Sequence, residues 1–135
     1  MDIIIKTTQK KEIIPFTEHI NHVLQKRQIK NGLCVIFVKH TTACVTTADL
    51  DPGTDLDMLD AFEAMMPKLH YRHPHSPSHV TDHILSSLIG PSLTVPINEG
   101  ILDLGTWQEV VLIELDGPRE RTVTLSFIQT STAED

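Results

Sequence analysis

Short β-prone segments separated by turn residues most constrain how this chain can fold. Leu33–Val38 is continuously apolar and predicts a central strand that is buried on both faces. Ala43–Thr47 follows closely, and we expect it to pair with that strand. Four further strands are predicted at Ile3–Thr8, Leu93–Ile97, Trp107–Leu115 and Arg121–Ile128. Turns at 98–100 and 116–118 join the last three of these, which predicts a mostly antiparallel sheet.

Three amphipathic segments predict helices that pack on this sheet. Their expected caps are Thr17, Thr54 and Ser78, and the residues expected to end them are Gly32, Pro67 and Gly90. Their apolar faces comprise Ile20, Val23 and Leu24, then Leu56, Leu59, Phe62 and Met66, and finally Val80, Ile84, Leu85 and Leu88. With only 4% aromatic residues, the core is expected to be aliphatic. The sequence thus predicts one α+β domain over residues 1–135, a mostly antiparallel β-sheet with three helices.

The charge of the chain argues against two classes of partner. Eighteen acidic residues against 11 basic ones give a formal net charge of −7, and the basic residues form no run or stripe. Nucleic acids and anionic membranes need a cationic protein face, so we expect the chain to bind neither. The same balance leaves room for a small positive pocket within an acidic surface.

Two features favour a cytoplasmic protein. Cys34 and Cys44 lie within apolar stretches, where cysteines are usually buried, and no disulfide framework is indicated. The N-terminal segment Met1–Lys6 lacks the basic and apolar regions of a signal peptide, and no stretch has the length of a membrane span.

Histidines are concentrated in one segment and indicate a candidate metal site. Five of the eight histidines fall between His70 and His83, and His40 stands apart at the end of the predicted central strand. Imidazole is the commonest protein ligand for zinc and similar divalent metals. His79 and His83 can share a helical face, and His73 can approach from the preceding loop. An equally good interpretation of the pattern is a solvated polar loop that holds no metal.

A second pattern suits an anion. His40, Thr41 and Thr42 bring an imidazole and two hydroxyls to a strand end, and Ser92 can add a third hydroxyl. Such groups bind phosphate or carboxylate oxygens. Two consecutive threonines are also ordinary strand sequence, and the pattern alone favours that interpretation. Gln108, at the start of a predicted strand, can face a pocket.

Acidic residues offer a third kind of chemistry. Asp49 and Asp51 lie in the loop after Ala43–Thr47, where they can serve as a general base or as ligands of a hard cation. Asp55 and Asp57 follow at the start of the second predicted helix and are expected to be solvated there. Nucleophilic catalysis finds little support, since the chain lacks a Gly-x-Ser-x-Gly elbow.

Several segments together resemble the YjbQ-like family of small α+β proteins. The matching segments are 40–43, 71–73, 83–96, 100–108 and 117–121, in the family's order. The resemblance implies a homotrimer with a polar site near a subunit interface. It also implies that His40, His73 and His83 form one pocket that holds a divalent metal, often zinc, or an anion. The family is associated with a secondary thiamine-phosphate synthase activity, which joins a hydroxymethylpyrimidine pyrophosphate to a thiazole phosphate and releases pyrophosphate.

Two positions depart from the family pattern. Ser78-His79 stands where many relatives carry an acidic pair, so His79 must replace that acid or the site differs. Asp49 stands where relatives tend to have Glu, and its shorter side chain places the carboxylate further from a ligand.

Three functions are expected as alternatives. In a synthase, Thr41 and Thr42 orient phosphate oxygens, and Asp49 or Asp51 is a base or a metal contact. A metal-dependent hydrolase of a small phosphorylated compound uses the three family-matched histidines, with water as the fourth ligand. The third alternative is a homotrimer that binds a metal or small ligand without catalysis. An open coordination position beside a pocket distinguishes the enzymes from the binding module.

Overall fold

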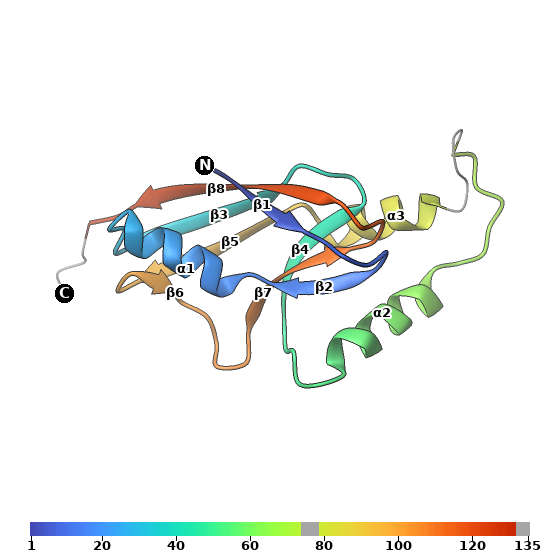
Figure 1. The fold of residues 1–135 in the computed structure, drawn as a ribbon, viewed down its shortest axis with the longest axis horizontal. Coiled ribbons are helices and arrows are strands. Elements are labelled where there is room, and N and C mark those ends of the chain that lie inside the picture. The colour runs from blue at the N-terminus through green and yellow to red at the C-terminus, as the bar shows by residue number, and fades with distance from the viewer. Residues whose placement is uncertain (74–78, 132–135) are drawn as a thin grey trace.

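The described residues, 1–73 and 79–131 of the computed structural model, form two antiparallel sheets and three helices (Figure 1). The larger sheet has the order β1-β8-β3-β5-β6, with strands Asp2–Lys6, Glu120–Gln129, Gly32–Val38, Ser92–Asn98 and Ile101–Leu102. The smaller sheet has the order β2-β7-β4, with strands Glu12–Pro15, Glu109–Glu114 and Ala43–Ala48. The helices are α1 (Thr17–Lys26), α2 (Thr54–Met65) and α3 (Val80–Ile89). The predicted α+β class is therefore confirmed, with two sheets in place of one.

The predicted central strand is confirmed as β3, which lies between β8 and β5. Its side chains, however, alternate between buried and more exposed positions. Cys34, Ile36 and Val38 are buried, whereas Leu33 and Phe37 are 37% and 44% exposed. The prediction of burial on both faces is wrong because α1 and the smaller sheet cover only one face of the larger sheet (Figure 1).

β4 belongs to the smaller sheet, which corrects the expected pairing of Ala43–Thr47 with the central strand. Cys44 lies opposite Ile113 of β7 in an antiparallel ladder. The chain leaves the larger sheet at Val38 and enters the smaller one at Ala43. Residues 39–42 therefore connect the two sheets, and we call them the sheet corner. An apolar pattern predicts a strand but does not identify its partner.

The predicted helices are confirmed, with differences at their ends. α1 begins at Thr17, but the cap position is Phe16 and no side chain caps the helix. It ends at Lys26, well before Gly32, because Gln28 turns the chain with a φ of 57°. None of the helices within the described residues is long and apolar enough to cross a membrane.

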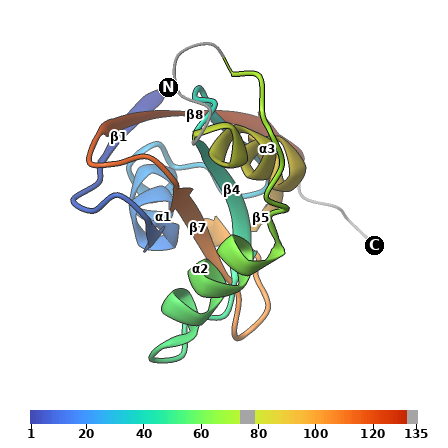
Figure 2. The ribbon, with the colours of Figure 1, turned by 90° about the vertical axis from the view of Figure 1, so that its right-hand side faces the viewer.

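α2 and α3 pack against the smaller sheet (Figure 2). Leu59, Phe62 and Met66 contact the buried cluster that contains Leu85, as their spacing predicts. Three other predicted face residues are exposed: Leu56 at 62%, Ile84 at 40% and Leu88 at 69%. The cap positions are Gly53 for α2 and His79 for α3, while Ser78, the predicted cap, lies outside the described residues. Gly90 ends α3 with a φ of 107°, as predicted.

Two short strands were not predicted. β2 has four residues and β6 has two, so neither shows a recognisable alternation. β2 lies at the edge of the smaller sheet, where Pro15 is tolerated despite its missing N–H.

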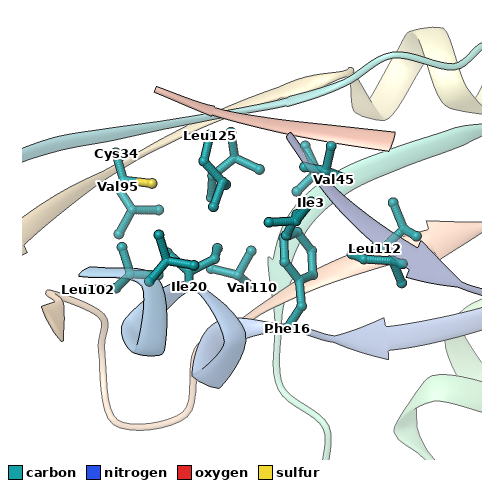
Figure 3. Close-up of a cluster of buried hydrophobic side chains, with 14 of the residues drawn as sticks. Ile3, Phe16, Ile20, Cys34, Val45, Val95, Leu102, Val110, Leu112 and Leu125 are labelled. Atoms are coloured by element: carbon teal, nitrogen blue, oxygen red, sulfur yellow. The ribbon is translucent and has the colours of Figure 1, made fainter. Parts of the chain in front are cut away.

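The main core lies between the larger sheet and a layer made of α1 and the smaller sheet (Figure 3). Leu125 of β8 and Val95 of β5 belong to this cluster, together with Ile20 of α1 and Leu112 of β7. Its buried side chains are mostly aliphatic, as the composition predicts, and Phe16 is the aromatic one. This packing fixes the two sheets against each other and so positions the sheet corner between them.

Candidate functional site

His40 lies in the sheet corner and is tied to β8. Its side chain is half-buried, and its Nε2 atom accepts a hydrogen bond from the backbone N–H of Thr122 at 2.8 Å. A neutral imidazole with Nε2 as acceptor carries its proton on Nδ1. His40 therefore has an N–H group to offer a ligand, while the lone pair of Nε2 is already used.

Burial and neighbouring charges both act on the pKa of His40. Burial lowers the pKa of its imidazole, and the charges of Arg121 and Arg119 lower it further, against the opposing charge of Glu114. The two cations outweigh the one carboxylate, although the chain as a whole carries a net charge of −7. The lowered pKa means that the ring is neutral near pH 7.

A buried ion pair lies next to the sheet corner. Arg121 and Glu114 are 2% and 0% exposed, and the guanidinium Nε donates to Glu114 Oε1 at 2.8 Å. The same guanidinium donates to Glu114 Oε2, and to the hydroxyl and carbonyl of Thr42 at 2.9 and 3.1 Å. Glu114 also accepts hydrogen bonds from Thr7 Oγ1 at 2.7 Å and from the backbone N–H of Asp116 at 3.1 Å. Both charges are therefore fully paired.

This network joins the two sheets, because Arg121 comes from β8 and Glu114 from β7. Burial acts to raise the pKa of Glu114, but the hydrogen bonds from Arg121 and Thr7 outweigh it and hold that pKa below its ordinary value. Sequence reasoning missed both residues of the pair. The available signal was a single charge within an apolar strand, since a buried charge requires a partner.

The predicted hydroxyl groups have different environments. Thr42 is 8% exposed, and its hydroxyl accepts a hydrogen bond from the Arg121 guanidinium, so its role is structural. Thr41 is exposed. Ser92 is also exposed and begins β5 opposite Phe37, near the end of β3. Ser92 therefore lies at the same end of the larger sheet as His40, as the anion pattern requires.

His73 and His83 form a separate pair. Their rings are stacked, with centroids 5.0 Å apart and planes at 21°. His83 is held on α3, and His73 lies in the described part of the loop that precedes it. His83 lies about two helical turns before Gly90, so the pair is about 10 Å along the helix axis from the C-terminal end of α3.

A complete metal site requires three or more donors around one point. Within residues 1–73 and 79–131, no three His, Cys, Asp or Glu side chains are arranged to hold a metal ion. His40 is therefore not grouped with the His73–His83 pair in a single chain, and its Nε2 is engaged with Thr122. The described donors of one chain therefore do not fit a three-histidine zinc site.

Asp49, Asp51 and Gln108 lie at the far end of β4 from the sheet corner. β4 separates Thr42 from Asp49, and a strand of this length spans about 20 Å. Asp49 Oδ1 accepts a hydrogen bond from the Asp51 backbone N–H at 3.0 Å, which forms a local turn. Gln108 accepts from the Gly105 N–H at 2.8 Å and donates to a threonine of β4 at 3.2 Å. All three are exposed, and the structure does not bring them to His40.

The two cysteines are packing residues. Cys34 and Cys44 are free and fully buried, and burial raises the pKa of each thiol to about 12. A thiolate is therefore disfavoured at both positions, which agrees with the absence of a nucleophile motif in the sequence.

Sequence comparison finds relatives that match most of this chain. The family model described as UPF0047 protein YjbQ-like matches residues 1–130. A UPF0047 protein of Mycobacterium tuberculosis is 37% identical over 132 residues, covering 95% of this chain and 97% of that protein. The UPF0047 protein YugU of Bacillus subtilis is 39% identical over 125 residues, covering 92% and 95%.

Solved structures show the same fold. An uncharacterised YjbQ/UPF0047 protein of Clostridium acetobutylicum superimposes with a TM-score of 0.85 and 32% identity, covering 95% of this chain and 99% of that one. A protein of unknown function from Sulfolobus solfataricus gives a TM-score of 0.87 at 32% identity, with 96% of each chain covered. The match in sequence and in structure extends over nearly the whole chain. The protein therefore belongs to the YjbQ-like UPF0047 family.

Proposed function

We propose that the sheet corner binds the anionic group of a small phosphorylated molecule. The observation that carries this proposal is the hydrogen bond from Thr122 N–H to His40 Nε2, which leaves the Nδ1–H of a neutral imidazole as a donor. The guanidinium groups of Arg121 and Arg119, which both act to lower the pKa of His40, support the same role. Thr41 and Ser92, both exposed at this end of the molecule, are the hydroxyls that can add further hydrogen bonds.

The reaction that we propose is a transfer or hydrolysis at the phosphorylated group. In the synthase alternative, the thiazole nitrogen forms a bond to the methylene carbon of the pyrimidine, and the carbon–oxygen bond to pyrophosphate breaks. His40 then stabilises the charge that develops on the departing pyrophosphate. The buried Arg121–Glu114 pair positions the corner and does not touch the substrate. Release of pyrophosphate only in the presence of the thiazole phosphate supports the synthase, and release without it supports a hydrolase.

Calorimetric titration with inorganic pyrophosphate tests the binding step. Replacing His40 by alanine removes a hydrogen bond to a charged group, so the dissociation constant should rise about tenfold or more. His22→Ala is the matched control, because His22 is an exposed histidine on α1. Equal affinity of wild type and His40→Ala refutes the proposal. Equal weakening by both variants also refutes it, since the effect would then not be specific to the sheet corner.

A metal at the His73–His83 pair is a second candidate, supported by the 5.0 Å approach of the two rings. Donors beyond these two would have to complete such a site. Elemental analysis of the untagged protein and its His83→Ala variant decides the question. Near-stoichiometric zinc that is lost in the variant supports a metal site, and equal metal content in both proteins excludes the pair as ligands.

We also propose a homotrimer, for which the open face of the larger sheet is the supporting feature. Ile4, Phe37 and Ile128 are 48%, 44% and 54% exposed, and apolar faces of this kind commonly mark contacts between subunits. Light scattering after size-exclusion chromatography should give three times the chain mass. Phe37→Ser should lower that mass, whereas Leu56→Ser on α2 should not. A monomeric wild-type protein contradicts the proposal.

A further inference from the structure

A groove of about 850 Å³ lies between α2, α3 and the segment that follows α2. Its apolar lining includes Leu59 and Phe62 of α2 and Leu85 of α3. One wall is the segment 67–71, which is closed on itself because the Tyr71 hydroxyl donates to the carbonyl of Pro67. The volume falls within the range of about 300–1,000 Å³ that is usual for small-molecule sites.

The groove is separate from the candidate site of the sheet corner. His40, His73 and His83 are not among the described residues that line it. Whether the sheet corner binds phosphate therefore does not affect the argument for this groove.

Cations gather at the groove although the chain is acidic. Lys10, Lys11 and Lys68 all line it, against the two acids Glu63 and Asp82. Lys11 Nζ lies 3.8 Å from Asp82 Oδ1 and is the cation paired with that carboxylate. Lys10 and Lys68 are exposed at the rim, and neither forms an ion pair with another residue of the described ranges. The rim thus has positive charge that no ion pair within the described ranges neutralises.

The wall of the groove carries one buried carboxyl group. Asp82 of α3 is only 5% exposed, and the 3.8 Å separation from Lys11 is longer than a hydrogen bond. A carboxyl group in such a position can accept a hydrogen bond from an N–H or O–H group of a ligand. The groove therefore combines an apolar floor, a hydrogen-bonding wall and a cationic rim.

We propose that this groove binds a small amphipathic organic anion, with a flat apolar body on Leu59 and Phe62 and a carboxylate, sulfonate or phosphate group at Lys10 and Lys68. An N–H or O–H group on the body hydrogen-bonds to Asp82. The apolar lining accounts for binding of the body, and the unpaired lysines account for the preference for an anion.

Fluorescence titration with 8-anilinonaphthalene-1-sulfonate tests the proposal, because this probe has an aromatic body, an N–H group and a sulfonate. Replacing Lys10 and Lys68 together by glutamine should weaken binding about tenfold, as expected for two exposed ion pairs. The double variant Lys26→Gln and Lys30→Gln makes the same change in charge away from the groove and should bind within twofold of wild type. N-phenyl-1-naphthylamine, which lacks the sulfonate, should bind more weakly than the anion and respond to neither change.

Three results would overturn the proposal. The first is equal weakening by the two double variants, which assigns the effect to net charge. The second is equal affinity for the anionic and neutral probes. The third is a set of probe-induced amide NMR shifts that map to the open face of the larger sheet and not to α2 and α3. Both double variants change exposed lysines, so each should remain folded, and circular dichroism verifies this.

Discussion

Replacing Arg121 by methionine is expected to destabilise the protein by about 3–5 kcal/mol, the usual cost of stranding one member of a buried ion pair. Arg121 donates hydrogen bonds to both carboxylate oxygens of Glu114 and to two atoms of Thr42. Without them, the fully buried Glu114 keeps only the hydrogen bonds from Thr7 and from the Asp116 N–H. Globular domains are stable by about 5–15 kcal/mol, so the loss is a large share of the total.

The loss of stability in the Arg121→Met variant should depend on pH. In the wild type the folded-state pKa of Glu114 is lowered, so its contribution to stability is present above the unfolded pKa, near 4.5, and is lost as the pH falls through the folded-state pKa. In the variant, burial is no longer opposed by the guanidinium, so the pKa of Glu114 rises above its unfolded value. The folded variant then takes up the proton more readily than the unfolded chain. The stability difference between the two proteins is therefore largest at pH 7 and narrows as the pH falls toward 4.

Urea unfolding followed by circular dichroism, at one protein concentration and at pH 7 and pH 5, measures this difference. The double variant Arg121→Met, Glu114→Leu removes the stranded carboxylate and should recover at least about half of the lost free energy of unfolding. A loss below about 1 kcal/mol in the single variant would place the pair among ordinary exposed ion pairs. That result, or a double variant no more stable than the single one, refutes the reasoning.

Three further predictions follow from the same structure. The pKa of His40 is lowered from 6.5 in the folded state, so the free energy of unfolding of the wild type should rise with pH between the folded-state pKa and 6.5. In urea unfolding from pH 5 to 8, His40→Gln should reduce this dependence of the free energy of unfolding on pH. Cys34 and Cys44, each with a thiol pKa of about 12, should resist iodoacetamide at pH 8 until urea unfolds the protein, and rapid native-state labelling would show that they are accessible. Gly32→Ala should cost at least about 2 kcal/mol in a thermal melt, since the new Cβ would lie 2.0 Å from the Ile128 carbonyl oxygen at a φ of +146°, and an unchanged melting temperature would contradict this.

The elements of the fold were largely predictable, whereas their partners were not. β-branched runs and turn residues identify β3, β4, β5, β7 and β8, because these signals are local. The assignment of β4 to a second sheet depends on the direction the chain takes after Val38, and that direction is set by packing. The exposure of Leu56 and Leu88 likewise depends on how α2 and α3 are tilted on the smaller sheet.

The candidate site was predictable only in part, for a related reason. His40 and Ser92 lie at one end of the larger sheet, as the anion pattern predicts. Asp49 is close to Thr42 in sequence, but an extended strand between them carries it far away. The Arg121–Glu114 pair was missed because each residue alone is an ordinary charge, and their meeting depends on the hairpin between β7 and β8.

The place of β8 in the larger sheet determines when the chain can fold during synthesis. β8 lies between β1 and β3, so Ile3 pairs with Val123 and Ile36 with Leu125. While the ribosome is still making the first hundred residues, β8 has not been synthesised. β1 and β3 therefore lack the strand that pairs with both of them, and apolar side chains on these strands stay uncovered. Long-range pairing of this kind is slow and leaves nascent strands open to aggregation. β1 can therefore join the rest of the larger sheet only after β8 has left the ribosome, whereas β3, β5 and β6 can pair earlier.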